Sequence, residues 1–164
     1  MVAEISTSAP DIIIAFIGES GSGKSTCINY FANYFTNSSF DRQDHYSNMK
    51  IVIPNNLFPK PNFFASKQKH TERNVHDNTI SQTQDCTVYD FSYDGQSIKI
   101  IDTPGFNDTD SSKDDQNVQK ILKQISKVPF ITAIIITING TNTRLSTSIK
   151  TTLTQLPKKH AIIV

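Results

Sequence analysis

The residues with the clearest chemical potential run from Gly18 to Ser25 and read Gly-Glu-Ser-Gly-Ser-Gly-Lys-Ser. This string is a complete G-x-x-x-x-G-K-[ST] phosphate-binding loop. Its glycines allow backbone N–H groups to curl around an anion without Cβ clashes. Lys24 can reach the β- and γ-phosphates of a nucleotide, and the Ser25 hydroxyl can ligate Mg²⁺. The predicted phosphate contacts are Gly18, Glu19, Ser20, Gly21, Ser22, Gly23, Lys24 and Ser25.

A second group of residues that could do chemistry is Asp102-Thr103-Pro104-Gly105, which follows the largely apolar strand segment 98–101. An Asp at the end of a buried strand can hold Mg²⁺, usually through water, opposite the Ser or Thr of a phosphate loop. The backbone N–H of Gly105 can bind a γ-phosphate. A D-x-x-G string alone often marks only a turn, so its position downstream of the loop is what favours a nucleotide site.

The segments on either side of the phosphate loop are predicted to be a strand before it and a helix after it. Residues 12–17 are apolar and predict a buried strand. Ile28, Phe31, Ala32 and Phe35 have the spacing of one helical face. Strand, glycine loop and helix is the arrangement in which this motif binds phosphate.

A hairpin leads into the Asp102 motif. Residues 87–93 alternate between apolar and polar, and Asp94-Gly95 is a type I′ turn signal because both central residues need positive φ. Residues 98–101 return antiparallel to them. Further helices are predicted at 118–125 and 149–156, and further strands at 131–138 and 160–164. The fold class expected is α/β.

The 164 residues suit one domain, with residues 1–11 as a tail, 12–164 as the folded part and 36–80 as a long insert. Within the insert, residues 49–53 could add a strand. The net charge of +1 does not favour nucleic acid as a partner. The longest apolar run, 131–138, is too short to span a bilayer, and no signal peptide is evident, so we expect a cytoplasmic protein without membrane association.

The hairpin that ends in D-x-P-G resembles the translation-factor and Ras-like superclass of GTPases. The pattern Thr83-x-x-Cys86 before the hairpin, followed by D-T-P-G-F, resembles the septin-related GTPases: the immunity-associated nucleotide-binding proteins and the chloroplast outer-envelope import GTPases. The resemblance implies a three-layer P-loop domain whose mostly parallel sheet has the order 2-3-1-4-5 with strand 2 antiparallel. It also implies GTP or GDP as ligand and Mg²⁺ as cofactor.

Carried over to this chain, the resemblance assigns the metal to Ser25, Thr83 and Asp102, although Thr79 and Thr87 compete with Thr83 for the mobile-loop position. Lys24 would act on the β- and γ-phosphates, Thr26 would support the α-phosphate, and Gly105 would sense the γ-phosphate. Arg144 resembles an Arg-x-[ST] box of the immunity-associated family. Such an Arg would reach across a homodimer formed at the nucleotide face and stabilise phosphoryl-transfer charge, with a solvated loop Arg as the alternative.

Phe106 stands where Ras-like enzymes place the Gln that orients water, so we expect slow intrinsic hydrolysis that a dimer or another protein accelerates. The alternatives are a nucleotide-stabilised scaffold and a P-loop ATPase. An ATP-binding-cassette protein would need an L-S-G-G-Q string, and a P-loop kinase would need an Arg-rich lid. In such GTPases guanine is recognised by an [NT]-K-x-D motif just after the fifth strand. The predicted fifth strand still continues at Val164, so we expect an incomplete domain. The preference for GTP over ATP is then inferred from the switch motifs and not from a residue that binds the base.

Overall fold

The computed structural model describes residues 12–36, 48–55, 58–63, 83, 85–106, 111–141, 144, 146–155 and 162–163. The proposed tail and most of the proposed insert lie outside these ranges. The elements that follow are those of the described residues.

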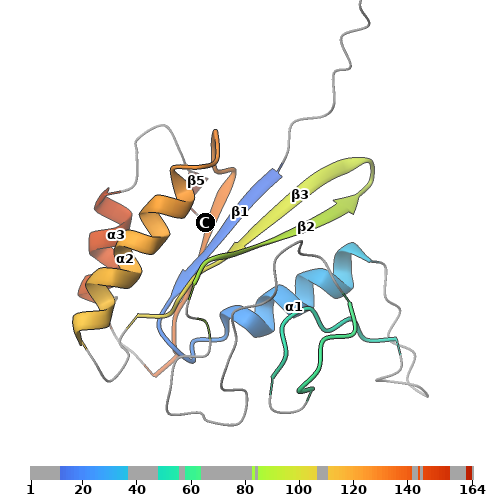
Figure 1. Ribbon diagram of the computed structural model, residues 1–164, viewed down its shortest axis with the longest axis horizontal. Coiled ribbons are helices and arrows are strands. Elements are labelled where there is room, and N and C mark those ends of the chain that lie inside the picture. The colour runs from blue at the N-terminus through green and yellow to red at the C-terminus, as the bar shows by residue number, and fades with distance from the viewer. Residues whose placement is uncertain are drawn as a thin grey trace, which may run out of the picture.

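A mixed sheet forms the centre of the molecule. Its strands are β1 (Ile12–Gly18), β2 (Thr87–Tyr93), β3 (Gln96–Asp102), β4 (Ala133–Thr137) and the two-residue β5 (Ile162–Ile163), in the order β2-β3-β1-β4-β5. The helices are α1 (Lys24–Phe35), α2 (Ser111–Ile125) and α3 (Thr147–Gln155). Helix α1 lies on one side of the sheet, and α2 and α3 lie together on the other (Figure 1). The α/β class is therefore confirmed.

The hairpin predicted from Asp94-Gly95 is present. Strand β2 pairs antiparallel with β3, whereas β3 and β4 both run parallel to β1. Asp94 and Gly95 have φ of 49° and 74°, the left-handed pair that a type I′ turn requires. The turn thus makes β2 antiparallel, and it delivers Asp102 to the same sheet edge as the end of β1.

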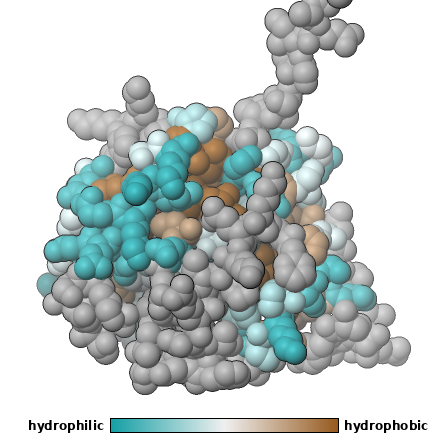
Figure 2. All heavy atoms as spheres, viewed as in Figure 1, coloured by the Kyte–Doolittle hydropathy of each residue, from teal (hydrophilic) through white to brown (hydrophobic). Residues whose placement is uncertain are grey.

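Side chains of β1 alternate between two apolar cores, because successive residues of a strand face opposite sides. Ile13, Ala15 and Ile17 pack with the residues of α2 and α3, while Phe16 packs with those of α1 and the hairpin. Hydrophilic residues gather over the outer side of α2, with apolar residues deeper toward the sheet (Figure 2). Both faces of the sheet are covered, which explains why β1 is apolar throughout.

The added strand expected at residues 49–53 is not formed. Within the described residues this segment pairs with no strand, although Ile51, Val52 and Ile53 are buried. Their backbone groups bind the side chains of α1 and of Asn62 instead. The apolar residue types of this segment predict its burial, but they do not indicate which groups its backbone binds.

Candidate nucleotide site

The phosphate loop connects the end of β1 to the start of α1. Gly21 and Gly23 have φ of 72° and 97°, a backbone conformation that L side chains rarely adopt. Gly23 is the N-cap of α1 and supplies no side-chain cap. No capping side chain therefore stands over the start of the helix, and a helix N-terminus of this kind can bind phosphate through its backbone N–H groups.

Lys24 is held beneath this loop. Its side chain is only 6% exposed, and Nζ donates hydrogen bonds to the carbonyl oxygens of Gly18 at 3.0 Å and Glu19 at 2.9 Å. These carbonyls fix the direction of the ammonium group before any ligand arrives. A buried, oriented cation beside helix N–H groups is suited to a phosphate anion.

A contact that the sequence did not indicate joins the loop to β4. The Ser22 hydroxyl lies 2.8 Å from the Glu19 carbonyl, to which it donates, and 2.7 Å from Thr137 Oγ1. A Cβ on Gly18 would overlap Thr137, so only glycine lets β4 approach so closely. Nothing in the sequence pairs Ser22 with Thr137, because the contact depends on β1 and β4 being neighbours.

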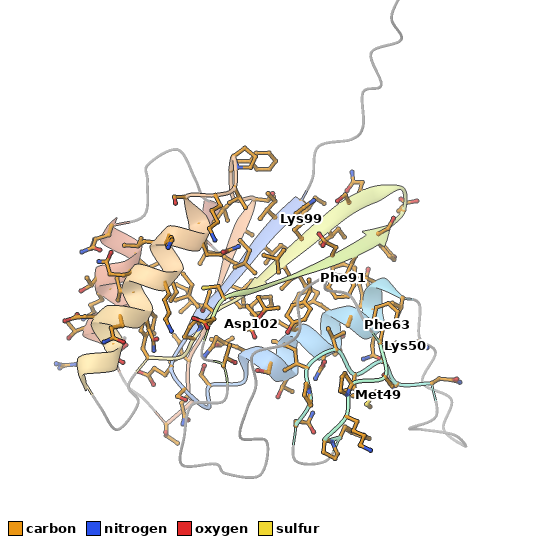
Figure 3. All side chains as sticks on the ribbon, viewed as in Figure 1. Met49, Lys50, Phe63, Phe91, Lys99 and Asp102 are labelled. Carbon is orange, nitrogen blue, oxygen red and sulfur yellow. The ribbon has the colours of Figure 1, made fainter. Side chains whose placement is uncertain are left out.

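Asp102 ends β3 (Figure 3), and its carboxyl group feels the charge of Lys24. Its side chain is 1% exposed, and Oδ1 has no hydrogen-bond partner among the described residues. Burial raises the pKa of Asp102 to about 6, while the charge of Lys24 and the backbone of Thr103 act in the opposite direction. An unpartnered buried carboxylate oxygen is costly unless a cation compensates it.

This oxygen provides a test of the predicted Mg²⁺ site. Mg²⁺ in nucleotide sites is bound through one or two carboxylates together with phosphates and water, so a dedicated protein cage is not needed. The buried, unpartnered Asp102 Oδ1 is a carboxylate oxygen of the kind that this donor set requires. In the described part of the chain no group of three or more His, Cys, Asp and Glu side chains could hold a metal by itself.

Gly105 and Phe106 are attached to the phosphate loop. Ser20 N–H donates to the Phe106 carbonyl at 2.8 Å, and Phe106 N–H donates to the Gly18 carbonyl at 3.2 Å, which makes a short parallel bridge. The Phe106 ring is fully buried among residues of β1 and α2. The ring that stands where the sequence analysis sought a water-orienting Gln is therefore part of the core.

Two further residues that sequence reasoning missed hold this motif. Thr103 Oγ1 donates to the Phe16 carbonyl at 2.6 Å, and Asn117 of α2 donates to the Gly105 carbonyl at 2.9 Å. Both side chains are buried. Thr103 lies within the motif, whereas Asn117 carries no signal in the sequence because its role follows from where α2 packs.

The remaining predicted residues differ in exposure. Thr83 is 7% exposed, whereas Thr26 and Arg144 are exposed. Beyond Thr83, Asp85 forms an ion pair of 3.0 Å with Lys120 of α2.

Burial, with Asp102 and Asp85 nearby, raises the pKa of the Cys86 thiol to about 12, which makes a redox or nucleophilic role unfavourable. Of the predicted site residues outside the phosphate loop, the structure thus brings Asp102 and Gly105 to the loop that carries Lys24.

No helix in the described ranges has the length and apolar character needed to cross a membrane. No curated protein matches the chain. A family model described as 50S ribosome-binding GTPase matches residues 65–164, which is more than half of the chain and includes the Asp102 motif, Asn117 and Arg144. The match covers more than half of the chain, and the chain therefore belongs to the 50S ribosome-binding GTPase family.

Proposed function

We propose that this chain is a guanine-nucleotide switch module that binds Mg²⁺ with GTP or GDP and hydrolyses GTP slowly. The observation that carries the proposal is Asp102, whose Oδ1 is buried and unpartnered and whose carboxyl group feels the charge of the oriented Lys24. A buried carboxylate without a hydrogen-bond partner destabilises the folded protein, and a bound metal ion would compensate that loss. The family membership favours GTP over ATP.

In this proposal Ser25 and Thr83 hydroxyls hold Mg²⁺ directly and Asp102 holds it through water. When bound there, Mg²⁺ would supply positive charge against the β- and γ-phosphates. Thr26 supports the α-phosphate, and the Gly105 N–H binds the γ-phosphate. The bonds that hold the Gly105 peptide, from Asn117 on its carbonyl and through the adjoining Phe106, support a pre-organised donor at that position.

Slow intrinsic turnover follows from Phe106, whose ring lies in the core and carries no group that binds water. Stimulation by a homodimer across the nucleotide face remains part of the proposal, as does the relationship to the septin-related GTPases. Arg144 is exposed on the chain between β4 and α3, which suits a residue that would act on the nucleotide of a second copy.

The test is nucleotide release from the purified chain, followed with fluorescent GTP, GDP and ATP analogues in Mg²⁺ and in EDTA. We expect guanine nucleotides to bind more tightly than ATP, and Mg²⁺ to slow their release. Lys24→Ala should abolish binding. Equal binding of ATP and GTP would instead favour the P-loop ATPase alternative.

A second candidate function is a nucleotide-stabilised scaffold, which the burial of Phe106 favours because the chain then lacks a water-orienting group at that position. Single-turnover GTP hydrolysis at low and high protein concentration separates the two. The switch predicts turnover that rises with concentration and falls in Arg144→Ala. The scaffold predicts binding without turnover at either concentration.

A further inference from the structure

Thr103 follows the last residue of β3, and its two hydrogen-bond donors have different partners. Its hydroxyl donates to the Phe16 carbonyl of β1 at 2.6 Å, and its backbone N–H donates to the Asp102 carboxylate. The Thr103 side chain is completely buried. One buried residue therefore connects the carboxylate at the end of β3 with the backbone of the strand that leads into the phosphate loop.

The register of the sheet explains why the Thr103 hydroxyl matters. Strands β1 and β3 lie side by side and pair in parallel up to Ala15 and Ile101 (Figure 1). Ile13 directs both its N–H and its carbonyl toward the β4 side, and the peptide groups of successive residues alternate, so the Phe16 carbonyl points toward β3. If the ladder continued beyond β3, this carbonyl would face the N–H of Thr103. The hydroxyl satisfies this buried acceptor, and the N–H serves the carboxylate.

The same motif reaches the phosphate loop three residues later. Phe106 N–H donates to the Gly18 carbonyl at 3.2 Å. Phe16 and Gly18 are two residues apart at the end of β1, so Thr103 and Phe106 attach the two ends of the motif to one short stretch of that strand. The Thr103 bond adjoins Asp102, and it determines how the end of β3 lies against the strand that carries the loop.

The Asp102 carboxylate depends on such an attachment, because its Oδ1 has no hydrogen-bond partner in the described part of the chain. We propose that Thr103 is a positioning residue for the metal ligand of the nucleotide site: its bond to Phe16 holds its N–H against the Asp102 carboxylate and so keeps Oδ1 available to the water that binds Mg²⁺. The inference rests on the proposed function and adds to it a role for a side chain that was not among the predicted site residues.

The expected size of the effect follows from what the hydroxyl holds. Thr103→Val keeps the shape of the side chain and the backbone N–H but removes the donor to Phe16, so a buried carbonyl loses its partner and the end of β3 is released. Loss of a group that orients a metal ligand typically weakens metal binding about 10- to 100-fold. Because the N–H is retained, we expect the lower end of that range.

The experiment measures the apparent dissociation constant of Mg²⁺ for the complex of the chain with a fluorescent GTP analogue, from the release rate of the analogue at a series of Mg²⁺ concentrations. We expect Thr103→Val to raise this constant roughly tenfold. The release rate in EDTA should stay close to that of wild type, because Asp102 is proposed to act through the metal. An unchanged Mg²⁺ constant in a folded Thr103→Val protein overturns the inference.

Thr103→Ser is the conservative variant. It keeps the hydroxyl and the N–H and removes only a methyl group, so its Mg²⁺ constant should stay close to that of wild type. If Thr103→Ser raises the constant as much as Thr103→Val does, the hydroxyl is not the group that matters, and the inference is wrong.

Thr152→Val is the matched control. Thr152 is also completely buried, and its hydroxyl donates to a backbone carbonyl, that of Ser148 at 2.9 Å, but within α3. The change should lower stability and leave the Mg²⁺ constant unchanged. An equal rise of the constant in Thr152→Val would mean that lost stability alone weakens metal binding, and would exclude a positioning role for Thr103.

An Asp102→Asn background tests the route of action. If Thr103 acts through the carboxylate, Thr103→Val should not raise the Mg²⁺ constant further in that background, and a full additional rise contradicts this route. The same pair of changes gives a measurement without nucleotide. Thr103→Val should lower the folding equilibrium constant roughly threefold more in wild type than in Asp102→Asn, because a hydrogen bond to a charged carboxylate is stronger than one to an amide. Equal losses in the two backgrounds contradict the coupling of Thr103 to Asp102.

Where Thr103→Val does not fold, Thr103→Ala removes the same hydroxyl and should raise the Mg²⁺ constant by a similar factor; no rise there overturns the inference. Failure of the proposed function is a different result. A wild-type chain that binds no guanine nucleotide, or binds it equally well in Mg²⁺ and in EDTA, refutes that function. Mg²⁺-dependent binding that the loss of the Thr103 hydroxyl leaves unchanged refutes only the role of Thr103.

Discussion

Gly105 lies against Ser20 so closely that a Cβ built on Gly105 would come within 2.6 Å of Ser20 Cα and 2.7 Å of Ser20 N. The two residues come from the Asp102 motif and the phosphate loop, which are far apart in the sequence. The bridge between Ser20 N–H and the Phe106 carbonyl holds them in this register. The backbones of the Asp102 motif and the phosphate loop are therefore in direct contact, and even a methyl group at position 105 would not fit between them.

Gly105→Ala is expected to destabilise the protein by about 1–3 kcal/mol, because the added methyl group meets backbone atoms that cannot rotate away. It should also weaken nucleotide binding, since the loop must move. Gly140→Ala is the control: a Cβ there meets nothing within 4 Å, and the change should stay within about 0.5 kcal/mol. Urea unfolding of both variants checks this, and equal stabilities would contradict the close contact.

Phe106→Gln is expected not to accelerate hydrolysis, although it introduces the residue that orients water in Ras-like enzymes. The side chain at this position lies in the core, where a carboxamide is buried in place of an apolar ring, so the loss of stability should be about 3 kcal/mol. Phe106→Leu should lose only about 1 kcal/mol. Single-turnover GTP hydrolysis with chemical unfolding measures both, and a stable, faster Phe106→Gln protein would contradict the buried position.

Asp102→Asn is expected to stabilise the nucleotide-free protein at pH 7 while it weakens Mg²⁺-dependent nucleotide binding. Burial raises the pKa of Asp102 from 3.8 to about 6, so the folded chain binds the proton more tightly than the unfolded chain. The stability that this protonation contributes is complete below about pH 4 and is lost as the pH rises through about 6.

The predicted gain for Asp102→Asn is therefore about 3 kcal/mol at pH 7 and disappears near pH 4. Unfolding free energies measured from pH 4 to 8 without nucleotide check the profile, with Asp90→Asn as the control. Asp90 is exposed on β2 and pairs only loosely with Lys99 at 3.9 Å. If the difference in unfolding free energy between wild type and Asp102→Asn did not change with pH, burial would not be raising the pKa of Asp102.

Thr137→Val is expected to lose about 1 kcal/mol of stability and to weaken nucleotide binding, because Ser22 loses its partner on β4. Thr132→Val is the matched control in the segment leading into the same strand, where Thr132 Oγ1 accepts from Ile13 N–H at 3.0 Å, away from the loop. Titration with a fluorescent nucleotide compares them. If both variants bind equally well, the Ser22–Thr137 contact has no part in holding the loop.

The parts of the fold that depend on local chemistry could be predicted. Asp94 and Gly95 determine a type I′ turn because both need positive φ, and that turn makes β2 antiparallel. The positive φ of Gly21 and Gly23 likewise explains why those glycines are needed in the phosphate loop. In such cases the information is contained within a few adjacent residues.

The error at residues 49–53 and the overlooked Thr137, Asn117 and Asn29 have a common cause. Each depends on a partner distant in the chain, and a lone Asn or Thr carries no pattern that identifies the partner. Burial of Val52 and Ile53 was evident from their apolar type, but their pairing with a helix side chain was not.

By itself the sequence determined that a phosphate loop, a hairpin and an Asp102 motif are present, because each is defined by residue types at fixed spacing. Only the tertiary structure decided that the Phe106 ring lies in the core and that Asp102 Oδ1 is buried without a partner. It also decided that Lys50, Val52 and Ile53 are hydrogen-bonded to asparagines of α1. The physical reason is that burial and hydrogen-bond partners are properties of packed elements, and the order of the strands brings those elements together only after the chain has folded.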